Sequence, residues 1–178
     1  MTTQKALDPV ELARLTLKEA VLDVIEFRGE TTIVIDRDHI VDACAFFKET
    51  EGLEYIYLSD IAGIDYYQQE PSERRFAANY HLYSFAYNRR LRLKVYAPED
   101  DPRIPSVSSV YPAADWEERE AYDMFGILFE GHPSLRRVLM PDDWDGHPQR
   151  KDYPLGYEQV QFSFNFDDID RLKPYAKE

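Results

Sequence analysis

Two glutamates in the second half of the chain, Glu118 and Glu120, are the first residues whose types and spacing suggest chemistry. A pair of carboxyl groups can act as a general acid and a general base. The surrounding sequence predicts a helix, however, and residues two positions apart on a helix point in different directions. We therefore do not expect paired-carboxylate catalysis from these two residues.

Two histidines, His132 and His147, each lie within a Gly-His-Pro sequence, with Asp142 and Asp143 between them. Such a set could hold a metal ion, but this region has no cysteine, no His-x-x-x-His spacing and no third histidine. Roles in stabilising turns or an interface are therefore favoured. The chain also lacks glycine-rich phosphate-binding sequences and Gly-x-Ser-x-Gly, so neither a nucleotide cofactor nor a serine nucleophile of that type is supported.

The composition favours a globular protein of the cytosol or of a surface exposed to it. The 178 residues are 44% hydrophobic and carry a formal net charge of −13, which argues against nucleic-acid binding and against a basic membrane anchor. No apolar run approaches the ~20 residues of a membrane-spanning helix, and the N-terminus resembles neither a signal nor a transit peptide. The single cysteine, Cys44, excludes an intramolecular disulfide and an all-cysteine metal or iron–sulfur site. Its place on an apolar helical stripe predicts a packed thiol.

The segment from Asp115 to Gly126 is expected to form the charged helix that positions the two glutamates. Asp115 is a suitable N-cap, Glu118 would complete a capping box, and Gly126 would end the helix. Asp115, Arg119 and Asp123 are spaced by four residues, so opposite charges should line one stripe. Apolar residues occupy more than one side of the helix, which predicts that neighbouring elements cover it and that its charges have specific partners.

Upstream of this helix, the hydrophobic periodicity predicts an α+β fold. The expected elements are a helix starting at Asp8, a hairpin of strands 24–28 and 31–36, a helix capped by Asp38, strands at 55–67 and 76–87, and a further strand after a turn at 88–89. The order α-β-β-α-β-β-β-α is typical of a two-layer domain with a mixed sheet. We assign this domain to residues 1–126 and an extended C-terminal arm to residues 127–178.

The last of these strands alternates between apolar and basic residues. The apolar residues that should face the core are Leu91, Leu93 and Val95. The basic residues that should face away are Arg90, Arg92 and Lys94. The basic stripe is interpreted first as a solvated sheet face, with a grip on an acidic partner as the alternative. Residues 68–75 should form an exposed polar loop, and the proline-rich residues 97–112 a linker.

The expected arm shows almost no helical or strand periodicity, yet its composition is not that of a disordered segment. Apolar residues such as Leu139 and Phe164 are spread along it, and we expect another protein to bury them. The arm should therefore extend away from the domain. Arg136, Arg137 and Arg150 can each form planar two-point hydrogen bonds to carboxylates across such an interface.

Three blocks of sequence in this region form a long, irregular motif. They are Glu-Arg-Glu-Ala-Tyr-Asp-Met-Phe-Gly at 118–126, Gly-His-Pro at 131–133 with Leu-Arg-Arg at 135–137, and Gly-His-Pro at 146–148 with Arg-Lys-Asp-Tyr-Pro at 150–154. The motif closely resembles the 30 kDa subunit (the C subunit) of proton-pumping NADH:quinone oxidoreductase, also called respiratory complex I or NDH-1. The close match covers about a quarter of the chain. Gln149 departs from the pattern, where leucine is expected in many relatives.

The resemblance implies a non-catalytic structural or assembly subunit in the hydrophilic arm of that complex. The complex passes electrons from NADH through FMN and iron–sulfur clusters to quinone and couples this to proton translocation; this chain would hold no cofactor. It would lie on the cytoplasmic face of the membrane as a peripheral subunit, against the large quinone-site subunit (49 kDa or D type) and neighbouring iron–sulfur subunits. The signature residues expected to contact partners are Glu118, Arg119, Glu120, Asp123, His132, Arg136, Arg137, His147, Arg150, Lys151 and Asp152.

Two alternative functions remain open at this point. The chain could be the matching subunit of a membrane-bound hydrogenase or a related dehydrogenase, in which case nickel-site subunits would be its neighbours. It could also be a freestanding small-molecule binding module, which would be monomeric, fully ordered and ligand-binding when purified.

Overall fold

The computed structural model describes residues 6–69, 71 and 74–154. The α-helices in this part of the chain are α1 (Pro9–Thr16), α2 (Ile40–Glu49) and α3 (Ala114–Phe125). The strands are β1 (Val21–Phe27), β2 (Glu30–Ile35), β3 (Tyr57–Asp65), β4 (Phe76–Ser84), β5 (Arg89–Ala97), β6 (Arg103–Pro105) and β7 (Leu128–Glu130). Single turns of 3₁₀ helix occupy Lys18–Ala20 and Arg37–His39.

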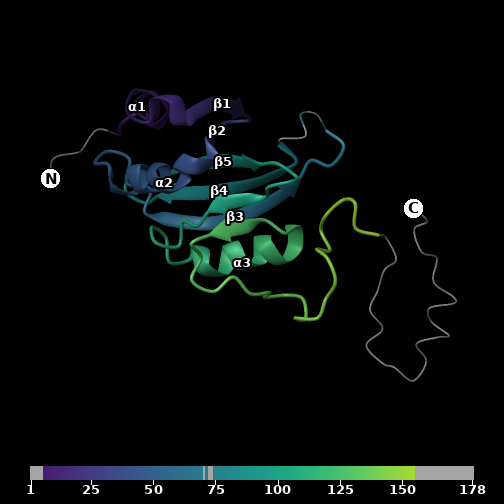
Figure 1. The fold of residues 1–178 in the computed structure, drawn as a ribbon. Coiled ribbons are helices and arrows are strands. Elements are labelled where there is room, and N and C mark those ends of the chain that lie inside the picture. The colour runs from purple at the N-terminus through teal and green to yellow at the C-terminus, as the bar shows by residue number, and fades with distance from the viewer. Residues whose placement is uncertain (1–5, 70, 72–73, 155–178) are drawn as a thin grey trace, which may run out of the picture.

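Five of these strands form one mixed sheet in the order β1-β2-β5-β4-β3 (Figure 1). β2 and β5 are parallel, whereas the other neighbouring strands are antiparallel. The three helices and five long strands follow one another as α-β-β-α-β-β-β-α, so the predicted order and the mixed sheet are confirmed. β5 lies at the centre because the chain returns to β2 after passing through α2, β3 and β4.

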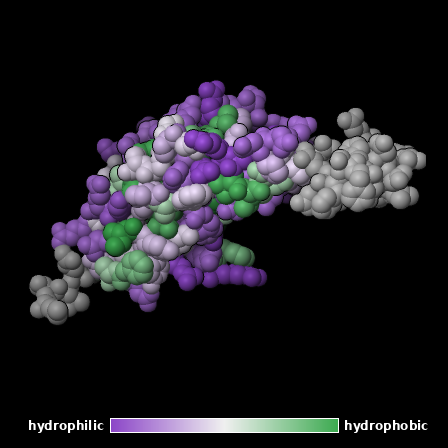
Figure 2. Space-filling model, turned by 90° about the horizontal axis from the view of Figure 1, so that it is seen from below, coloured by the Kyte–Doolittle hydropathy of each residue, from purple (hydrophilic) through white to green (hydrophobic). Residues whose placement is uncertain are grey.

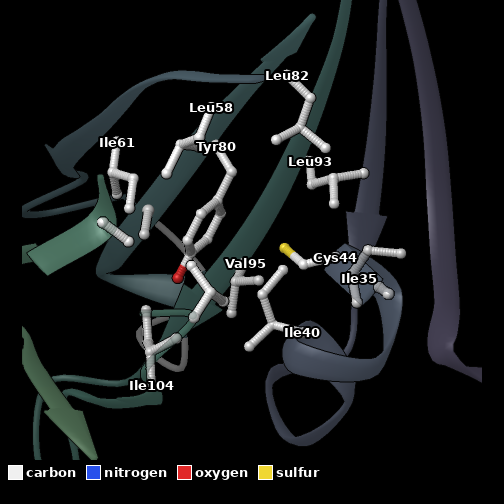
Figure 3. Close-up of a cluster of buried hydrophobic side chains, with 14 of the residues drawn as sticks. Ile35, Ile40, Cys44, Leu58, Ile61, Tyr80, Leu82, Leu93, Val95 and Ile104 are labelled. Atoms are coloured by element: carbon white, nitrogen blue, oxygen red, sulfur yellow. The ribbon is translucent and has the colours of Figure 1, made fainter. Parts of the chain in front are cut away.

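The three helices contribute to a single core on one face of this sheet. Leu93 and Val95 of β5 are buried in a cluster that also contains Ala13 of α1, Cys44 of α2 and Ala121 of α3. Figure 3 shows Cys44 among the aliphatic side chains of this cluster. Burial raises the pKa of the Cys44 thiol, which stays protonated, and the predicted packed cysteine is confirmed.

The aspartate caps predicted for α1 and α2 have different outcomes. Asp8 caps α1 as predicted, because its carboxylate accepts a hydrogen bond from the Val10 N–H at 2.8 Å. The prediction that Asp38 caps α2 is wrong. Asp36 accepts a hydrogen bond from the Asp38 N–H at 3.1 Å and starts a 3₁₀ turn, so that α2 begins only at Ile40.

The segment predicted as a linker contains β6, which pairs in parallel with β7 just after α3. Ile104, Ile127 and Phe129 are buried in the main core. Residues 127–130 therefore belong to the domain, and the predicted boundary after Gly126 divides packed structure. Strands of three residues are too short to show an alternating pattern. Residues 155–178 of the predicted arm lie outside the described residues, so their extension from the domain stays a prediction.

The surface that carries α3 combines charged residues with scattered apolar ones. Figure 2 views the molecule from below Figure 1, on the side where α3 lies, and shows hydrophobic patches between hydrophilic ones. Trp116 of α3 is 63% exposed and Leu139 in the following loop is 58% exposed. Across the described ranges, no helix combines the length and the hydrophobicity needed to span a membrane.

Candidate functional site

The start of α3 is fixed by a buried glutamate rather than by a capping box. The helix begins at Ala114, one residue before the predicted cap, and its N-cap makes no side-chain hydrogen bond. The carboxylate of Glu118 instead accepts hydrogen bonds from the Val107 N–H at 2.7 Å and the Ser106 hydroxyl at 2.6 Å. Burial raises the pKa of Glu118 to about 7, against the lowering effect of these two hydrogen bonds. Glu118 thus fastens the segment before α3 to the helix.

The carboxylate of Asp123 is the centre of the loop that follows α3. One oxygen accepts a hydrogen bond from Arg137 at 2.7 Å, and the other accepts the backbone N–H groups of Val138, Leu139 and Met140 at 2.9, 2.8 and 2.9 Å. Burial opposes ionisation, but the hydrogen bonds from Met140, Arg137 and the other amides hold the pKa of Asp123 below its ordinary value. Consecutive amides around one oxygen form an anion-binding nest, so ionised Asp123 determines the path of this loop.

The C-terminal end of α3 is covered by the second Gly-His-Pro block. Nδ1 of His147 lies 3.0 Å from the carbonyl oxygen of residue 123. The Gln149 N–H donates to the carbonyl oxygen of residue 124 at 3.0 Å, and Arg150 Nε donates to the carbonyl oxygen of residue 125 at 2.6 Å. These carbonyls have no partner within the helix and would otherwise be unsatisfied. Nδ1 of His147 must carry the proton because it faces a carbonyl, and burial lowers the pKa of this histidine.

Gly126 ends α3 as predicted, in the left-handed conformation with φ of 76°. A Cβ atom at this position would lie 2.3 Å from Nη2 of Arg150 and 2.6 Å from the ring of His147. Glycine is therefore required here for two reasons, the backbone conformation and the close approach of the two side chains that cover the helix end.

Arg119 does not form the predicted stripe of opposite charges with Asp115 and Asp123. Its guanidinium donates to the carbonyl oxygens of residues 136 and 137, at 3.1 and 3.3 Å, and stacks over Trp116 at 4.6 Å from the ring centroid. Charge pairs along an exposed helix contribute only about 0.2–0.5 kcal/mol each, so the loop carbonyls are the stronger partners. Arg119 thus holds the same loop that Asp123 organises.

The first Gly-His-Pro block is bound to the N-terminal part of α3. His132 has a fully buried side chain, and its Nε2 lies 3.0 Å from the carbonyl oxygen and 3.1 Å from the carboxylate of Asp115. Its Nδ1 accepts the Ser134 N–H at 3.0 Å, so the proton of the neutral ring is on Nε2. Arg136 is exposed and donates from Nε to the Ser134 hydroxyl at 3.0 Å.

A buried arginine that the sequence did not reveal ties the end of this loop to the sheet. Arg75 was expected in an exposed polar loop but is only 3% exposed. Its guanidinium lies 2.7 Å from Asp152 and 3.3 Å from Asp65 and also pairs with Glu99. Burial would lower the pKa of Arg75, but the hydrogen bonds to Asp152 and Asp65 raise it. Asp65 also accepts the Lys151 N–H at 2.8 Å. No periodic pattern marks Arg75, because it lies one residue before β4.

The structure brings most of the predicted signature residues into one hydrogen-bonded unit, the α3–loop unit, which we define as residues 106–107, α3 and residues 131–153. The signature side chains bonded within this unit or to the sheet are Glu118, Arg119, Asp123, His132, Arg136, Arg137, His147, Arg150 and Asp152. Glu120 is exposed, and Lys151 is exposed and bonded through its backbone. Contacts of these residues with a partner stay a prediction.

The chemistry available to the unit is that of fixed ion pairs and hydrogen bonds. Glu118 is buried while Glu120 is exposed, so the two carboxylates do not converge. His132 and His147 are bonded near opposite ends of α3, each with its protonated nitrogen facing the helix. In the part of the chain that the structure describes, no three His, Cys, Asp or Glu side chains are grouped as metal ligands.

Comparisons with solved structures support the fold. The trypsin-resistant fragment (1–134) of Nqo5 is 34% identical, with a TM-score of 0.61, and the match covers 71% of this chain and 96% of that one. A chain of the membrane-bound sulfane sulfur reductase, an archaeal respiratory membrane complex, is 22% identical with a TM-score of 0.67, over 95% of this chain and 94% of that one. The second similarity shows the fold alone.

Comparisons of sequence identify the family. Residues 33–159 match the family described as respiratory-chain NADH dehydrogenase, 30 kDa subunit. The NADH-quinone oxidoreductase C subunit of Roseiflexus castenholzii is 48% identical over 176 residues, which cover 97% of this chain and 99% of that protein. The protein of the same name from Herpetosiphon aurantiacus is 44% identical over 150 residues, 84% of this chain and 86% of that one. The chain therefore belongs to the family of the 30 kDa subunit of respiratory-chain NADH dehydrogenase.

Proposed function

We propose that this chain is a structural and assembly subunit in the hydrophilic arm of a NADH-quinone oxidoreductase, and that it catalyses no step itself. The observation that carries the proposal is the saturation of Asp123, whose carboxylate is occupied by Arg137 and three backbone amides. Most charged side chains of the signature are thus bonded within the chain itself, chiefly to backbone groups. Their role is to hold an irregular surface in one shape, which suits a subunit that other subunits must recognise.

Electron transfer in the complex would be carried by FMN and iron–sulfur clusters in partner subunits, and we expect no cofactor in this chain. Its single cysteine, Cys44, is fully buried in the apolar core, and its raised pKa disfavours the thiolate that a metal ligand requires. His132 and His147 each use the ring nitrogen that carries the proton to bond α3.

The partners we propose are the large quinone-site subunit, of the 49 kDa or D type, and the neighbouring iron–sulfur subunits. Trp116, Leu139 and Glu120 are exposed on the α3–loop unit and are available for such contacts. An exposed tryptophan stacked on an arginine is the kind of anchor found at the centre of protein interfaces. The complex would place the chain on the cytoplasmic face of the membrane as a peripheral subunit.

The names of the relatives favour this function over the corresponding subunit of a membrane-bound hydrogenase, because the curated relatives described above are C subunits of NADH-quinone oxidoreductase. A freestanding binding module is the candidate from a different class. The two alternatives differ in what would co-purify with the chain.

The test is purification of the tagged full chain from detergent-solubilised membranes of its own cells. We expect it to be recovered with flavin- and iron–sulfur-containing subunits and with NADH:quinone activity, and the chain purified alone should be colourless and poor in metal. Recovery with nickel-site subunits would establish the hydrogenase alternative. A monomer that binds a small molecule and no other subunit would contradict an assembly role.

A further inference from the structure

The face of the sheet opposite the helices carries polar side chains at its centre. The core-facing residues of β4 and β5 are buried, and the alternate residues Arg90, Arg92 and Lys94 point away from the core. The strand register places His81 opposite Arg92 and Asn79 opposite Lys94. We call the surface formed by these side chains of β4 and β5, with their neighbours on β2 and β3, the open sheet face.

The charges at the centre of this face contrast with those of the whole chain. The chain has a formal net charge of −13, yet three cations line the outer side of β5. Arg92 is paired with Glu30 of β2 and bonded to Thr32, and Lys94 donates to Tyr66 at 2.5 Å. Arg90 is exposed and forms no side-chain hydrogen bond with any residue that the structure describes.

An exposed aromatic cluster lies directly beside Arg90. The register places Tyr83 opposite Arg90, and the ring of Tyr83 lies 4.9 Å from that of Phe85, which is 5.5 Å from that of Tyr57. Phe85 is 61% exposed and Tyr57 is 48% exposed. Arginine and aromatic residues are the types that dominate the energetic centres of protein interfaces.

An open groove of about 1320 Å³ is lined both by cationic residues of β5 and by the aromatic cluster. Its lining includes the aromatic cluster, His81 and three arginines, Arg89, Arg90 and Arg92. It also includes four carboxylates, Asp8, Glu26, Glu30 and Asp60, of which Glu30 is paired with Arg92. Two buried polar atoms of the open sheet face, Asn79 Oδ1 and Arg92 Nε, have no hydrogen-bond partner among the described residues. Such unmet groups are costly unless a partner or ordered water completes them.

We infer that the open sheet face docks a carboxylate-bearing segment of another subunit, with Arg90 as the main cationic contact and the Tyr57–Tyr83–Phe85 cluster as the apolar anchor. The inference rests on the proposed function, because the partner is a subunit of the same complex. A guanidinium that makes no side-chain hydrogen bond among the described residues can form a two-point pair with a carboxylate. Nucleic-acid phosphates do not fit, since the acidic chain as a whole repels them.

The first test reverses the charge of Arg90 in the full chain. Membranes carrying tagged Arg90→Glu should yield about tenfold less of the other subunits with the chain than wild type, since two like charges would face each other. Arg14→Glu is the matched control, because Arg14 is exposed on α1 and changes the net charge equally. It should assemble like wild type. Equal recovery with the two variants would overturn the inference while leaving the proposed function intact.

The second test identifies the group of the partner subunit that contacts position 90. Arg90→Lys keeps the charge and provides an amine for zero-length carbodiimide coupling to carboxylates in the intact complex. Mass spectrometry should find a new amide link to an Asp or Glu of another subunit. No link from this position, or a link to a second copy of this chain, would overturn the inference. If wild-type chain recovers no other subunit, the proposed function fails together with this inference.

Discussion

The sheet and the α3–loop unit are held together by different kinds of interaction. The sheet and α2 bury a continuous apolar cluster, and the buried hydroxyls of Tyr55, Tyr80 and Ser84 have no hydrogen-bond partner among the described residues. The α3–loop unit buries two carboxylates, Glu118 and Asp123, and each is bonded through both oxygens. The first region is specified by where apolar residues lie, the second by which polar groups meet.

This difference explains how a segment without regular structure can be well determined. Residues 131–153 form no helix or strand, yet they bond α3 near its start, along its side and at its end. Polar networks of this kind are sensitive to the loss of one member, because the remaining groups are left buried and unpaired. Loss of a buried apolar group instead costs stability in proportion to the cavity that it leaves. Substitutions in the α3–loop unit can test this contrast.

Asp123→Ala should be the most damaging single change in the α3–loop unit. It leaves Arg137 and three backbone amides without their acceptor, which should lower the free energy of unfolding by about 3–5 kcal/mol. Chemical denaturation of the isolated chain measures this. Asp145→Ala, at an exposed position of the same loop, should cost under about 0.5 kcal/mol. Similar costs for the two variants would show that the nest is not needed for folding.

The raised pKa of Glu118 predicts a specific pH dependence of the free energy of unfolding. Its pKa is raised from 4.5 to about 7 in the folded protein, so folding favours the protonated form. Its contribution to stability is therefore full below pH ~4.5 and is lost as the pH rises to ~7, a change of about 3 kcal/mol. Glu118→Gln should remove this part of the slope. Glu120→Gln, at an exposed position, should retain it. A wild-type curve no steeper than that of Glu118→Gln would contradict the assignment.

Alanine substitutions at Gly126 and Gly131 distinguish the cost of backbone strain from the cost of disturbing close packing. Both have positive φ, 76° and 81°, but a Cβ at Gly131 would meet nothing within 4 Å, while one at Gly126 would meet Arg150 and His147. Gly131→Ala should cost about 1 kcal/mol from backbone conformation, and Gly126→Ala about 2–3 kcal/mol because it also displaces the helix cover. Thermal unfolding of both variants gives the difference in stability. Equal losses would mean that the contacts of Arg150 and His147 with the end of α3 contribute nothing to stability.

Arg119→Ala should have a smaller effect than Asp123→Ala or Gly126→Ala, about 1–2 kcal/mol. The half-buried guanidinium bonds loop carbonyls and Trp116, so its removal does not strand carboxylates, contrary to what the spacing of charges suggested. Arg119→Lys should recover only part of the loss, because a single ammonium cannot reproduce the planar contacts. A loss above about 3 kcal/mol for Arg119→Ala would instead indicate a buried ion pair.

The same contrast explains what the sequence could predict. Alternation in β5 and the Asp8 cap were recognisable because each depends on residues close together in sequence, and the structure confirms both. The partners of Glu118 and Arg119 were not recognisable, because they lie 11 to 18 residues away in irregular segments. Arg75 was missed for the same reason, since its partner Asp152 is in a different part of the chain.

The family resemblance identified the right region without revealing how it works. The signature residues were expected to contact partner subunits, and the structure shows that most of them bond the chain to itself. Physical rules of spacing are strongest for helices and strands, and residues 131–153 form only isolated turns. The fold was therefore largely predictable, whereas the geometry of the site required the structure.

The most direct test is hydrogen exchange of the Val138, Leu139 and Met140 amides in the isolated chain. If these amides bind Asp123 without help from another subunit, they should exchange at least about 100-fold more slowly than unstructured peptide, and Asp123→Ala, which removes the acceptor, should abolish the protection while β4 amides keep theirs. Exchange at the unprotected rate in the wild-type chain would show that the loop takes its shape only within the complex, and would contradict a self-contained α3–loop unit.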